Sequence, residues 1–237
     1  MNEVLGIALP AWALSFWQAN SWLAEALAVA TWETIYMVLI STLGSYIFGL
    51  PIGIILVATE PGHILENKKV NQILGSIVNV TRSIPFIIFL ILLIPFTRWV
   101  VGTYIGTIAS IVPLTLAAIP FVARLVESSL KEIQWGLIEA ALSMGANAWQ
   151  VICKVLVPEA LPSICLGVAI TAINLVGYSA MAGIVGGGGL GTLAYYQGYQ
   201  RYNSLVMWST VVVLIILVQG MQMLGDILSA RVAKKRR

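Results

Sequence analysis

The sequence has very few of the residues that most enzymes use for catalysis or for metal binding. Its 237 residues include one histidine, His63, one aspartate, Asp226, and two cysteines, Cys153 and Cys165. Intramembrane proteases need paired aspartates, a serine with a histidine or lysine, or a zinc motif, so hydrolysis is excluded. The two cysteines do not have a metal-site spacing and are predicted to be small apolar fillers. The histidine is predicted to be a solvated loop side chain, and we expect no catalytic residues.

A phosphate-binding loop is also missing from the sequence. No segment fits G-x-x-x-x-G-K-[ST], so the chain cannot hold ATP in the usual manner. Gly186, Gly188 and Gly191 do satisfy G-x-G-x-x-G, but no strand precedes them and no ribose-binding acid follows in a βαβ unit. We predict instead a glycine-rich re-entrant or loop segment, which gives flexibility or close helix approach.

Charge is scarce, and apolar residues take its place. Charged residues make up 10% of the chain, against roughly 25% in soluble domains, and hydrophobic residues make up 59%. The mean hydropathy is +0.93. A membrane-spanning helix needs roughly 20 apolar residues, and five stretches qualify. The sequence thus predicts an all-α integral membrane protein with five transmembrane helices, at about 32–58, 75–97, 103–124, 161–183 and 205–228.

The distribution of basic residues predicts the orientation of these spans, because short cytoplasmic loops carry the excess of lysine and arginine. One side has only Arg98 and Arg201 in its loops, and the segment before the first span has no basic residue. The other side holds the rest, mainly Lys68, Lys69, Arg124, Lys131, Lys154, Arg231 and Lys234 to Arg237. This predicts the N-terminus outside and the C-terminus inside. The basic tail is expected to anchor the chain at anionic lipid rather than to bind nucleic acid.

Three regions follow from this layout. Residues 1–30 are rich in tryptophan but interrupted by polar residues, so we expect an interfacial extension on the outer surface. A sixth span is the alternative, and it would move the N-terminus inside. Residues 31–223 form the membrane domain, with a polar loop at 127–160. Residues 224–237 comprise the end of the last helix and a basic cytoplasmic tail.

The polar loop contains a short amphipathic helix. Leu137, Ala140, Ala141 and Met144 fall at i, i+3, i+4 and i+7, so they form one small apolar stripe, while Glu139 lies on another face. Gly145 is predicted to end this helix, since glycine takes left-handed backbone angles without a clash, and Asn147 with Gln150 resembles a capping box that opens the next helix. The stripe could fill a partner's groove or fold onto its own chain.

The order Glu139-Ala140-Ala141-x-x-x-Gly145, followed by Val155-x-Val157-Pro158, resembles the EAA loop of type I bacterial ABC importer permeases. The family pattern ends Ile-x-Leu-Pro, and the two valines here keep an apolar side chain. The resemblance implies a cytoplasmic helix that sits in a groove of a separate ATPase and passes its motion to the membrane helices. Leu137, Glu139, Ala140, Ala141, Met144 and Gly145 would make that contact.

Further blocks are similar to the permeases of methionine uptake systems, and this similarity covers nearly everything after Trp32. The blocks are Arg82 to Phe86, Pro113 to Thr115, Pro120 to Arg124, Leu175 to Met181 and Gly188 to Gly191. The resemblance implies a homodimer in the bacterial inner membrane with two cytoplasmic ATPase subunits, which hold ATP and magnesium, and an outer substrate-binding lipoprotein. The imported solute would be D- or L-methionine or a close analogue. The alternatives are another amino acid or small solute in the same importer class, and a secondary carrier or channel.

Polar and adaptable side chains within the spans are candidates for the solute path. Tyr178, Ser179 and Met181 lie where the fourth span meets the glycine-rich segment, and methionine offers a polarizable surface that suits a thioether. Helix packing is the alternative role for such groups. Arg82 is the only ionisable residue that approaches the midplane, and it could snorkel to the cytoplasmic face. Gly49-x-x-x-Gly53 predicts that two helices approach closely.

Overall fold

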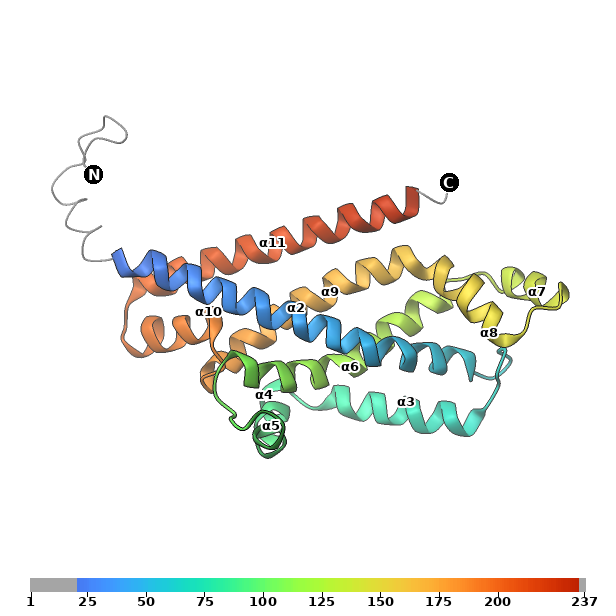
Figure 1. Cartoon of the computed structure of the whole chain (residues 1–237), viewed down its shortest axis with the longest axis horizontal. Helices are drawn as coiled ribbons and strands as arrows, with labels where there is room; N and C mark the ends of the chain where they lie inside the picture. The colour runs from blue at the N-terminus through green and yellow to red at the C-terminus, as the bar shows by residue number, and fades with distance from the viewer. Residues whose placement is uncertain (1–20, 235–237) are drawn as a thin grey trace.

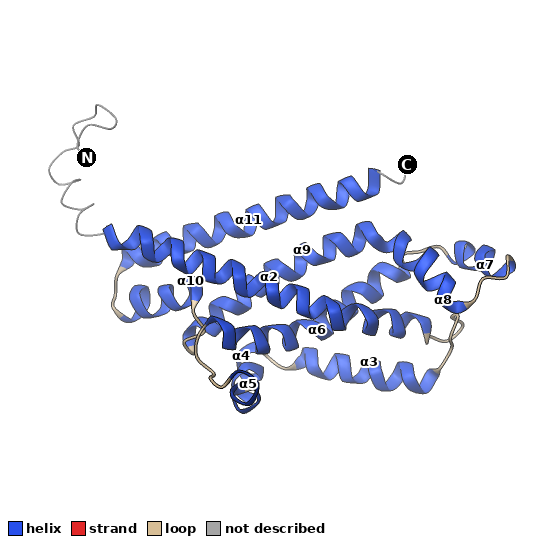
Figure 2. Cartoon of the chain, viewed as in Figure 1, coloured by secondary structure: helices blue, strands red, loops and turns tan. Residues whose placement is uncertain are grey.

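The computed structural model describes residues 21–234, and every regular element in that range is a helix (Figure 2). The predicted all-helical class is therefore confirmed for the described residues. The α-helices are α2 (Ser21–Ala58), α3 (Lys68–Ser83), α4 (Phe86–Leu92), α5 (Ile94–Val101), α6 (Thr107–Lys131), α7 (Trp135–Ser143), α8 (Ala148–Val151), α9 (Val157–Ile184), α10 (Gly189–Thr192) and α11 (Ser204–Lys234). Two π-helical segments, η1 (Ile152–Leu156) and η2 (Leu193–Gln200), join α8 to α9 and follow α10.

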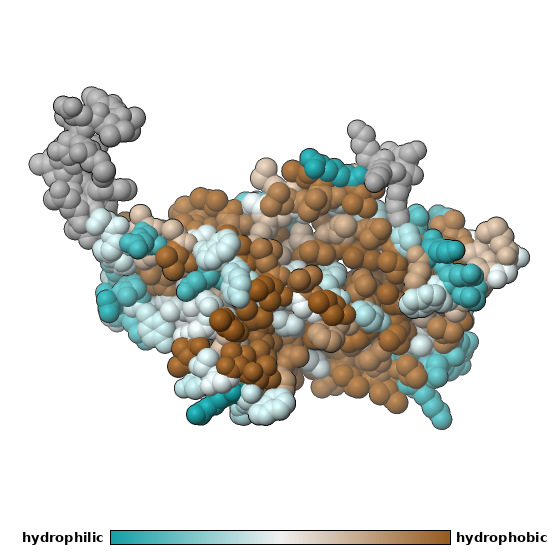
Figure 3. All heavy atoms as spheres, viewed as in Figure 1, coloured by the Kyte–Doolittle hydropathy of each residue, from teal (hydrophilic) through white to brown (hydrophobic). Residues whose placement is uncertain are grey.

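Four long helices match four of the five predicted spans. Within the described residues, Ser21–Ala58, Thr107–Lys131, Ala148–Ile184 and Ser204–Val232 are long and apolar enough to cross a membrane. Helices α2, α6 and α11 run in one direction and α9 runs in the other, so α7 and the C-terminal end of α11 lie at one end of the bundle, with α10 at the other (Figure 1). We call these the α7 end and the α10 end. Apolar side chains cover much of the middle of the visible face, and hydrophilic ones gather toward both ends (Figure 3).

The second predicted span is broken. A span over 75–97 was expected, with Pro85 as a possible bend point, and in the structure α3 and α4 meet at an angle of 101° and α5 follows as a third piece. Pro85 has no N–H to continue the ladder, and it forces the preceding Ile84 into an extended conformation (φ −80°, ψ 122°). The segment is therefore three helices rather than one. The bent pair counts as a fifth span only if both pieces together cross the membrane.

The first helix starts earlier than the first predicted span. Residues 21–30, which the sequence assigned to a separate N-terminal extension, continue into α2 without a break. Its 38 residues are about 57 Å long at 1.5 Å per residue, well beyond the roughly 30 Å of a hydrocarbon core. The rest of the predicted extension, residues 1–20, lies outside the described residues. Cys153, a predicted filler, is exposed, so that prediction is wrong, whereas Cys165 is partly buried.

Helices α2 and α6 pack closely through the predicted Gly49-x-x-x-Gly53 motif. A Cβ on Gly53 would lie 2.7 Å from the carbonyl oxygen of Ala123 and 2.7 Å from the Cβ of Val126. A Cβ on Gly49 would lie 2.8 Å from Val122. Real Cβ atoms do not approach other atoms so closely, so the two backbones are in contact only because both positions are glycine. The close approach predicted from the sequence is confirmed.

At the α10 end, the glycine-rich segment is held against α2 and against the first turn of α6. Gly189 N–H donates to Glu33 Oε2 at 2.7 Å, and Leu190 N–H donates to Thr34 Oγ1 at 2.9 Å, both on α2. Ser110 on α6 donates to the carbonyl oxygen of Gly187 at 3.1 Å. The segment is thus a structured connection that satisfies its backbone groups through neighbouring helices.

Candidate functional site

The α7 helix ends as its sequence predicts. Gly145 has φ +84°, its N–H donates to the carbonyl oxygen of Leu142 at 2.9 Å, and Ala146 N–H donates to that of Ala141 at 3.1 Å. This pair of bonds is the Schellman motif, which satisfies carbonyls that the helix leaves free. Asn147 then caps α8 reciprocally with Gln150 through bonds of 2.9 and 3.0 Å. The predicted order of helix, stop and helix is confirmed.

The two faces of α7 differ in what they contact. Leu137, Ala140 and Met144 of the predicted stripe are exposed, with Met144 82% exposed, and Glu139 is also exposed. Ala141 instead faces the rest of the chain and is only 6% exposed. Three residues of the stripe are therefore exposed, and the fourth packs within the chain. Nearby Trp135, Leu142 and Trp149 add 45%, 40% and 71% exposed apolar side chains to the same end of the bundle.

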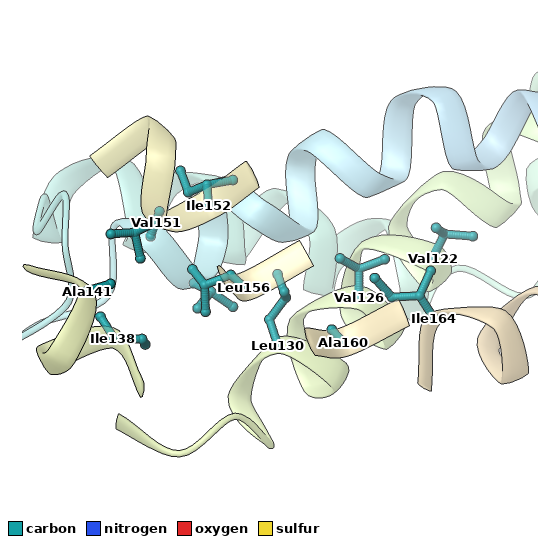
Figure 4. Packing of buried hydrophobic residues seen from close by; sticks show 12 residues of the cluster. Val122, Val126, Leu130, Ile138, Ala141, Val151, Ile152, Leu156, Ala160 and Ile164 are labelled. Atoms are coloured by element: carbon teal, nitrogen blue, oxygen red, sulfur yellow. The ribbon is translucent and has the colours of Figure 1, made fainter. Parts of the chain in front are cut away.

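Ile138, which the sequence analysis did not single out, anchors the inner face of α7. It is 2% exposed and lies with Ala141 in a buried cluster that reaches three long helices (Figure 4). The other buried members are Val57, Ala58, Val122, Val126, Leu130, Val151, Ile152, Leu156, Ala160 and Ile164. The sequence spacing could have indicated this buried face, because Ile138 and Ala141 are three residues apart and therefore lie on one side of the helix. A force applied to α7 therefore acts on α2, α6 and α9 through close-packed side chains.

A charged network beside this cluster links three helices at the α7 end. Lys131 Nζ lies 3.0 Å from Glu127 Oε1 on α6 and 3.0 Å from Glu60 Oε1 after α2. Arg124 pairs with the same Glu127 and donates to Asn79 Oδ1 on α3 at 2.8 Å. Glu127 is only 8% exposed, so it needs both cations to offset its desolvation. Polar contacts thus hold α3, whose only buried residue is Val78.

His63 lies in the loop after α2, as predicted, but it is partly buried rather than fully solvated. Its ring lies 5.3 Å from that of Trp135 in an edge-to-face arrangement, and its Nδ1 is buried with no hydrogen-bond partner among the described residues. Burial lowers the pKa of His63, against the opposing charge of Glu60. The contact is therefore favoured while the ring is neutral and weakens as the pH falls through the lowered pKa.

Loss of the cap on α8 should loosen the exposed end locally. Asn147→Ala removes one side-chain acceptor and leaves the N–H of Gln150 without its partner, at a cost of about 1 kcal/mol. We expect faster hydrogen exchange across residues 144–151, with unchanged exchange in α2 and α6. Asn147→Ser retains a capping oxygen and should keep exchange close to that of the wild type. Unchanged protection in Asn147→Ala would show that the cap contributes nothing to this segment.

The three predicted path residues, which are neighbours on α9, face different surroundings. Tyr178 stacks on Phe86 with ring centroids 4.5 Å apart and lines a cavity of about 210 Å³. Ser179 is 2% exposed and donates to the carbonyl oxygen of Val176 on its own helix, and it does not line the cavity. Met181 is 44% exposed on the outer surface of α9. Of the three, only Tyr178 faces this cavity.

Arg82 also lines the cavity, where the sequence analysis had suggested that it could snorkel away. The wall comprises Thr81, Arg82, Ile84, Phe86, Phe89, Ala117, Phe121, Asn174 and Tyr178. These residues come from α3, α4, α6 and α9. The bend at Pro85 lets residues of α3 and of α4 line the same cavity. The cavity therefore combines one cation, several hydrogen-bonding groups and three phenylalanine rings.

Sequence comparison places the chain among transport proteins. The profile described as binding-protein-dependent transport system inner membrane component matches residues 49–237. A probable D-methionine transport system permease protein MetI of Vibrio cholerae is 52% identical over 222 residues, which cover 92% of this chain and 99% of the relative. The methionine import system permease protein MetP of Bacillus subtilis is 45% identical over 206 residues, with coverage of 87% and 93%.

Solved structures share the architecture. A chain of the MetNI methionine ABC transporter, in an inward-facing conformation, superimposes with a TM-score of 0.87 at 50% identity, over 88% of this chain and 97% of the other. A chain of an amino acid ABC transporter crystallised with histidines has a TM-score of 0.71 at 19% identity, over 92% and 97%. The second likeness shows a shared fold alone.

Proposed function

Since this chain belongs to the family of binding-protein-dependent transport system inner membrane components, we propose that it forms the translocation pathway of an ATP-driven importer for methionine or a close analogue. Similarity to methionine permeases over nearly the full length of both chains supports the solute. The exposed face of α7 carries the coupling part of the proposal. An importer for another amino acid in the same class is the alternative.

A partner ATPase explains why α7 is built with an anchored face and a free face. Leu137, Ala140 and Met144 present apolar side chains to solvent beside Glu139, at the end of the bundle that also holds most of the basic residues. Exposed large apolar side chains clustered in this way are typical of interaction sites. An amphipathic helix commonly docks in a partner's groove through such a face. A carrier or channel that works alone has no use for this surface.

The proposed orientation puts the α7 end in the cytoplasm and the start of α2 outside. Lys68, Lys131 and Lys154 lie in or beside the connections at the α7 end, whereas Arg201 lies at the α10 end. This distribution agrees with the positive-inside rule. A substrate-binding lipoprotein would then meet the α10 end, where the glycine-rich segment lies. Two ATPase subunits, which hold ATP and magnesium, would meet the α7 end.

A second copy of this chain is proposed to complete the pathway. Ile170, Gly177, Met181 and Ile184 fall on one face of α9 and are all exposed. In a bilayer, a face that includes a glycine allows two helices to approach closely. The apolar side chains of this face and the lipid tails are equally apolar, so the fit of the two helix surfaces, rather than the hydrophobic effect, would drive this association.

The transport cycle needs no covalent chemistry in this chain. Closure of the ATPase subunits on ATP would move α7, and the buried cluster around Ile138 would carry this motion to α2, α6 and α9. The pathway then exposes alternate sides of the membrane, with two packed arrangements that differ by a few kcal/mol, as in other ligand-driven switches. Solute from the outer binding protein enters in one arrangement and leaves to the cytoplasm in the other.

Purification of the tagged full-length chain from its native membrane tests this assembly. We expect an ATPase to co-purify, ATP hydrolysis in the preparation, and a native mass spectrum with two copies of each chain. Methionine uptake into liposomes should then require ATP and the binding protein. A chain that purifies alone and transports without ATP would contradict the proposal and favour a secondary carrier or channel.

A further inference from the structure

The cavity at the Pro85 bend has the composition of a binding site for a free amino acid. We propose that Arg82 binds the α-carboxylate of the transported solute there, and that the phenylalanine rings of the wall hold its apolar side chain. This inference rests on the proposed function, because it assigns a solute site to the same pathway. It adds a residue, Arg82, that neither the loop motif nor the predicted path residues include.

Arg82 has no partner of its own in the described part of the chain. Its side chain forms no ion pair or hydrogen bond there, whereas Arg124 on the neighbouring helix is held by Glu127 and Asn79. No aspartate or glutamate lines the cavity. Arg82 is exposed in the single chain, but it lies in a segment predicted to be within the membrane, where a guanidinium is costly unless an anion compensates it. A carboxylate can accept two parallel N–H bonds from this group, so a solute carboxylate supplies the missing partner.

The remaining polar groups suit the other end of an amino acid backbone. Asn174 on α9 offers a carbonyl oxygen that can accept from an α-ammonium group, and Tyr178 adds a hydroxyl. Neither side chain has a hydrogen bond to another described residue, although Tyr178 stacks on Phe86. The face of an aromatic ring also attracts an ammonium group. The cavity therefore carries unpaired groups for both charges of a zwitterion.

The size and apolar wall narrow the class of solute. The cavity measures about 210 Å³, below the roughly 300–1,000 Å³ of sites for drug-sized ligands, so it suits a single amino acid. Phe86, Phe89 and Phe121 offer aromatic surface, which packs favourably against a thioether sulfur. A lysine solute would bring a second cation toward Arg82 with no acidic side chain to pair with it. We thus expect preference for methionine and similar linear apolar amino acids.

Binding to the purified full-length chain in phosphatidylcholine nanodiscs tests the site directly, by calorimetry with L-methionine, L-methioninol and L-lysine. Methioninol has a hydroxyl in place of the carboxylate. We expect the wild type to bind methionine about 10- to 100-fold more tightly than methioninol, the loss expected when a charged hydrogen bond is removed. Arg82→Gln should lower the affinity for methionine by the same factor and change the affinity for methioninol little. Arg82→Lys should recover part of the loss, and lysine should bind weakly.

Arg98→Gln is the matched control, because Arg98 lies on α5 and does not line the cavity. Its affinity for methionine should equal that of the wild type. Equal affinity of the wild type for methionine and methioninol would overturn the proposal, and so would failure to bind millimolar methionine. Displacement of methionine by phosphatidylglycerol but not by free amino acids would assign Arg82 to a lipid headgroup instead. The assay contains no ATPase, so its outcome is independent of whether α7 couples to one.

Discussion

Glu139→Lys should leave the protein in the membrane at normal abundance but abolish ATP-driven uptake. Glu139 is exposed on the free side of α7, and its side chain forms no ion pair or hydrogen bond within residues 21–234. The substitution therefore costs little folding energy, since exposed positions away from special features usually change stability by less than about 0.5 kcal/mol. If α7 docks on an ATPase as proposed, reversed charge at the centre of that surface would cost far more, because it would oppose a groove matched to a carboxylate.

The measurement is the amount of ATPase that co-purifies with each variant, together with methionine uptake in the same membranes. We expect co-purification to fall at least tenfold in Glu139→Lys. Glu66→Lys reverses a charge of the same size at the same end, where Glu66 forms an exposed pair with Lys68 and accepts an exposed hydrogen bond from Gly62 N–H, and it should retain both activities. Normal assembly and uptake in Glu139→Lys would rule out α7 as the docking element.

A second pair of variants separates the shape of α7 from its charge. Gly145 has φ +84°, and a Cβ there would meet no other atom, so the cost of substitution is backbone strain alone. Asparagine tolerates left-handed angles and should keep uptake, whereas valine should distort the turn and reduce it. Equal uptake in Gly145→Asn and Gly145→Val would show that the turn does not matter for coupling.

Local chemistry explains what could be predicted at this site. Gly145 and Asn147 were predicted correctly because a helix stop and a capping box depend on residues within a few positions of each other. The division of the apolar stripe could not be predicted, because it depends on how α7 packs against α8 and η1 and on the buried cluster that these form with α6 and α9. Likewise, Ile138 and Leu137 look equally apolar in the sequence, and only tertiary packing distinguishes them.

The fold shows the same limit. Hydropathy predicted four long helices, because span length depends only on composition along one segment. Pro85 gave a reason for an interruption, but an interrupted helix can kink slightly or turn sharply, and the 101° turn depends on how α4 packs against α6 and α9. The position of Arg82 follows from that turn. A snorkelling arginine and a cavity-lining arginine have the same sequence signature, so only the structure distinguishes them.

Gly53→Leu should prevent the bundle from assembling correctly. A Cβ at this position already lies 2.7 Å from a backbone oxygen of Ala123, which cannot move without shifting α6 itself. Overpacking typically costs about 1–3 kcal/mol where side chains can adjust, and here the cost should exceed that range because the backbone must yield. The displaced α6 also carries Val126 of the buried cluster and Arg124 of the charged network, so α7 and α3 lose their supports together.

We expect little folded Gly53→Leu protein in the membrane and a markedly lower midpoint of thermal unfolding in detergent. Gly220→Leu is the control, because Gly220 also lies within an apolar helix, α11, but a Cβ there would meet nothing within 4 Å. Its midpoint should match the wild type. Adding Val126→Ala to Gly53→Ala removes only the contact with Val126 Cγ1 at 2.8 Å and leaves the clashes with Val126 Cβ and the carbonyl oxygen of Ala123, both at 2.7 Å, so it should rescue little. A wild-type midpoint in Gly53→Leu would mean that α2 and α6 can separate freely, and the rigid link from α7 to the membrane helices would then be lost.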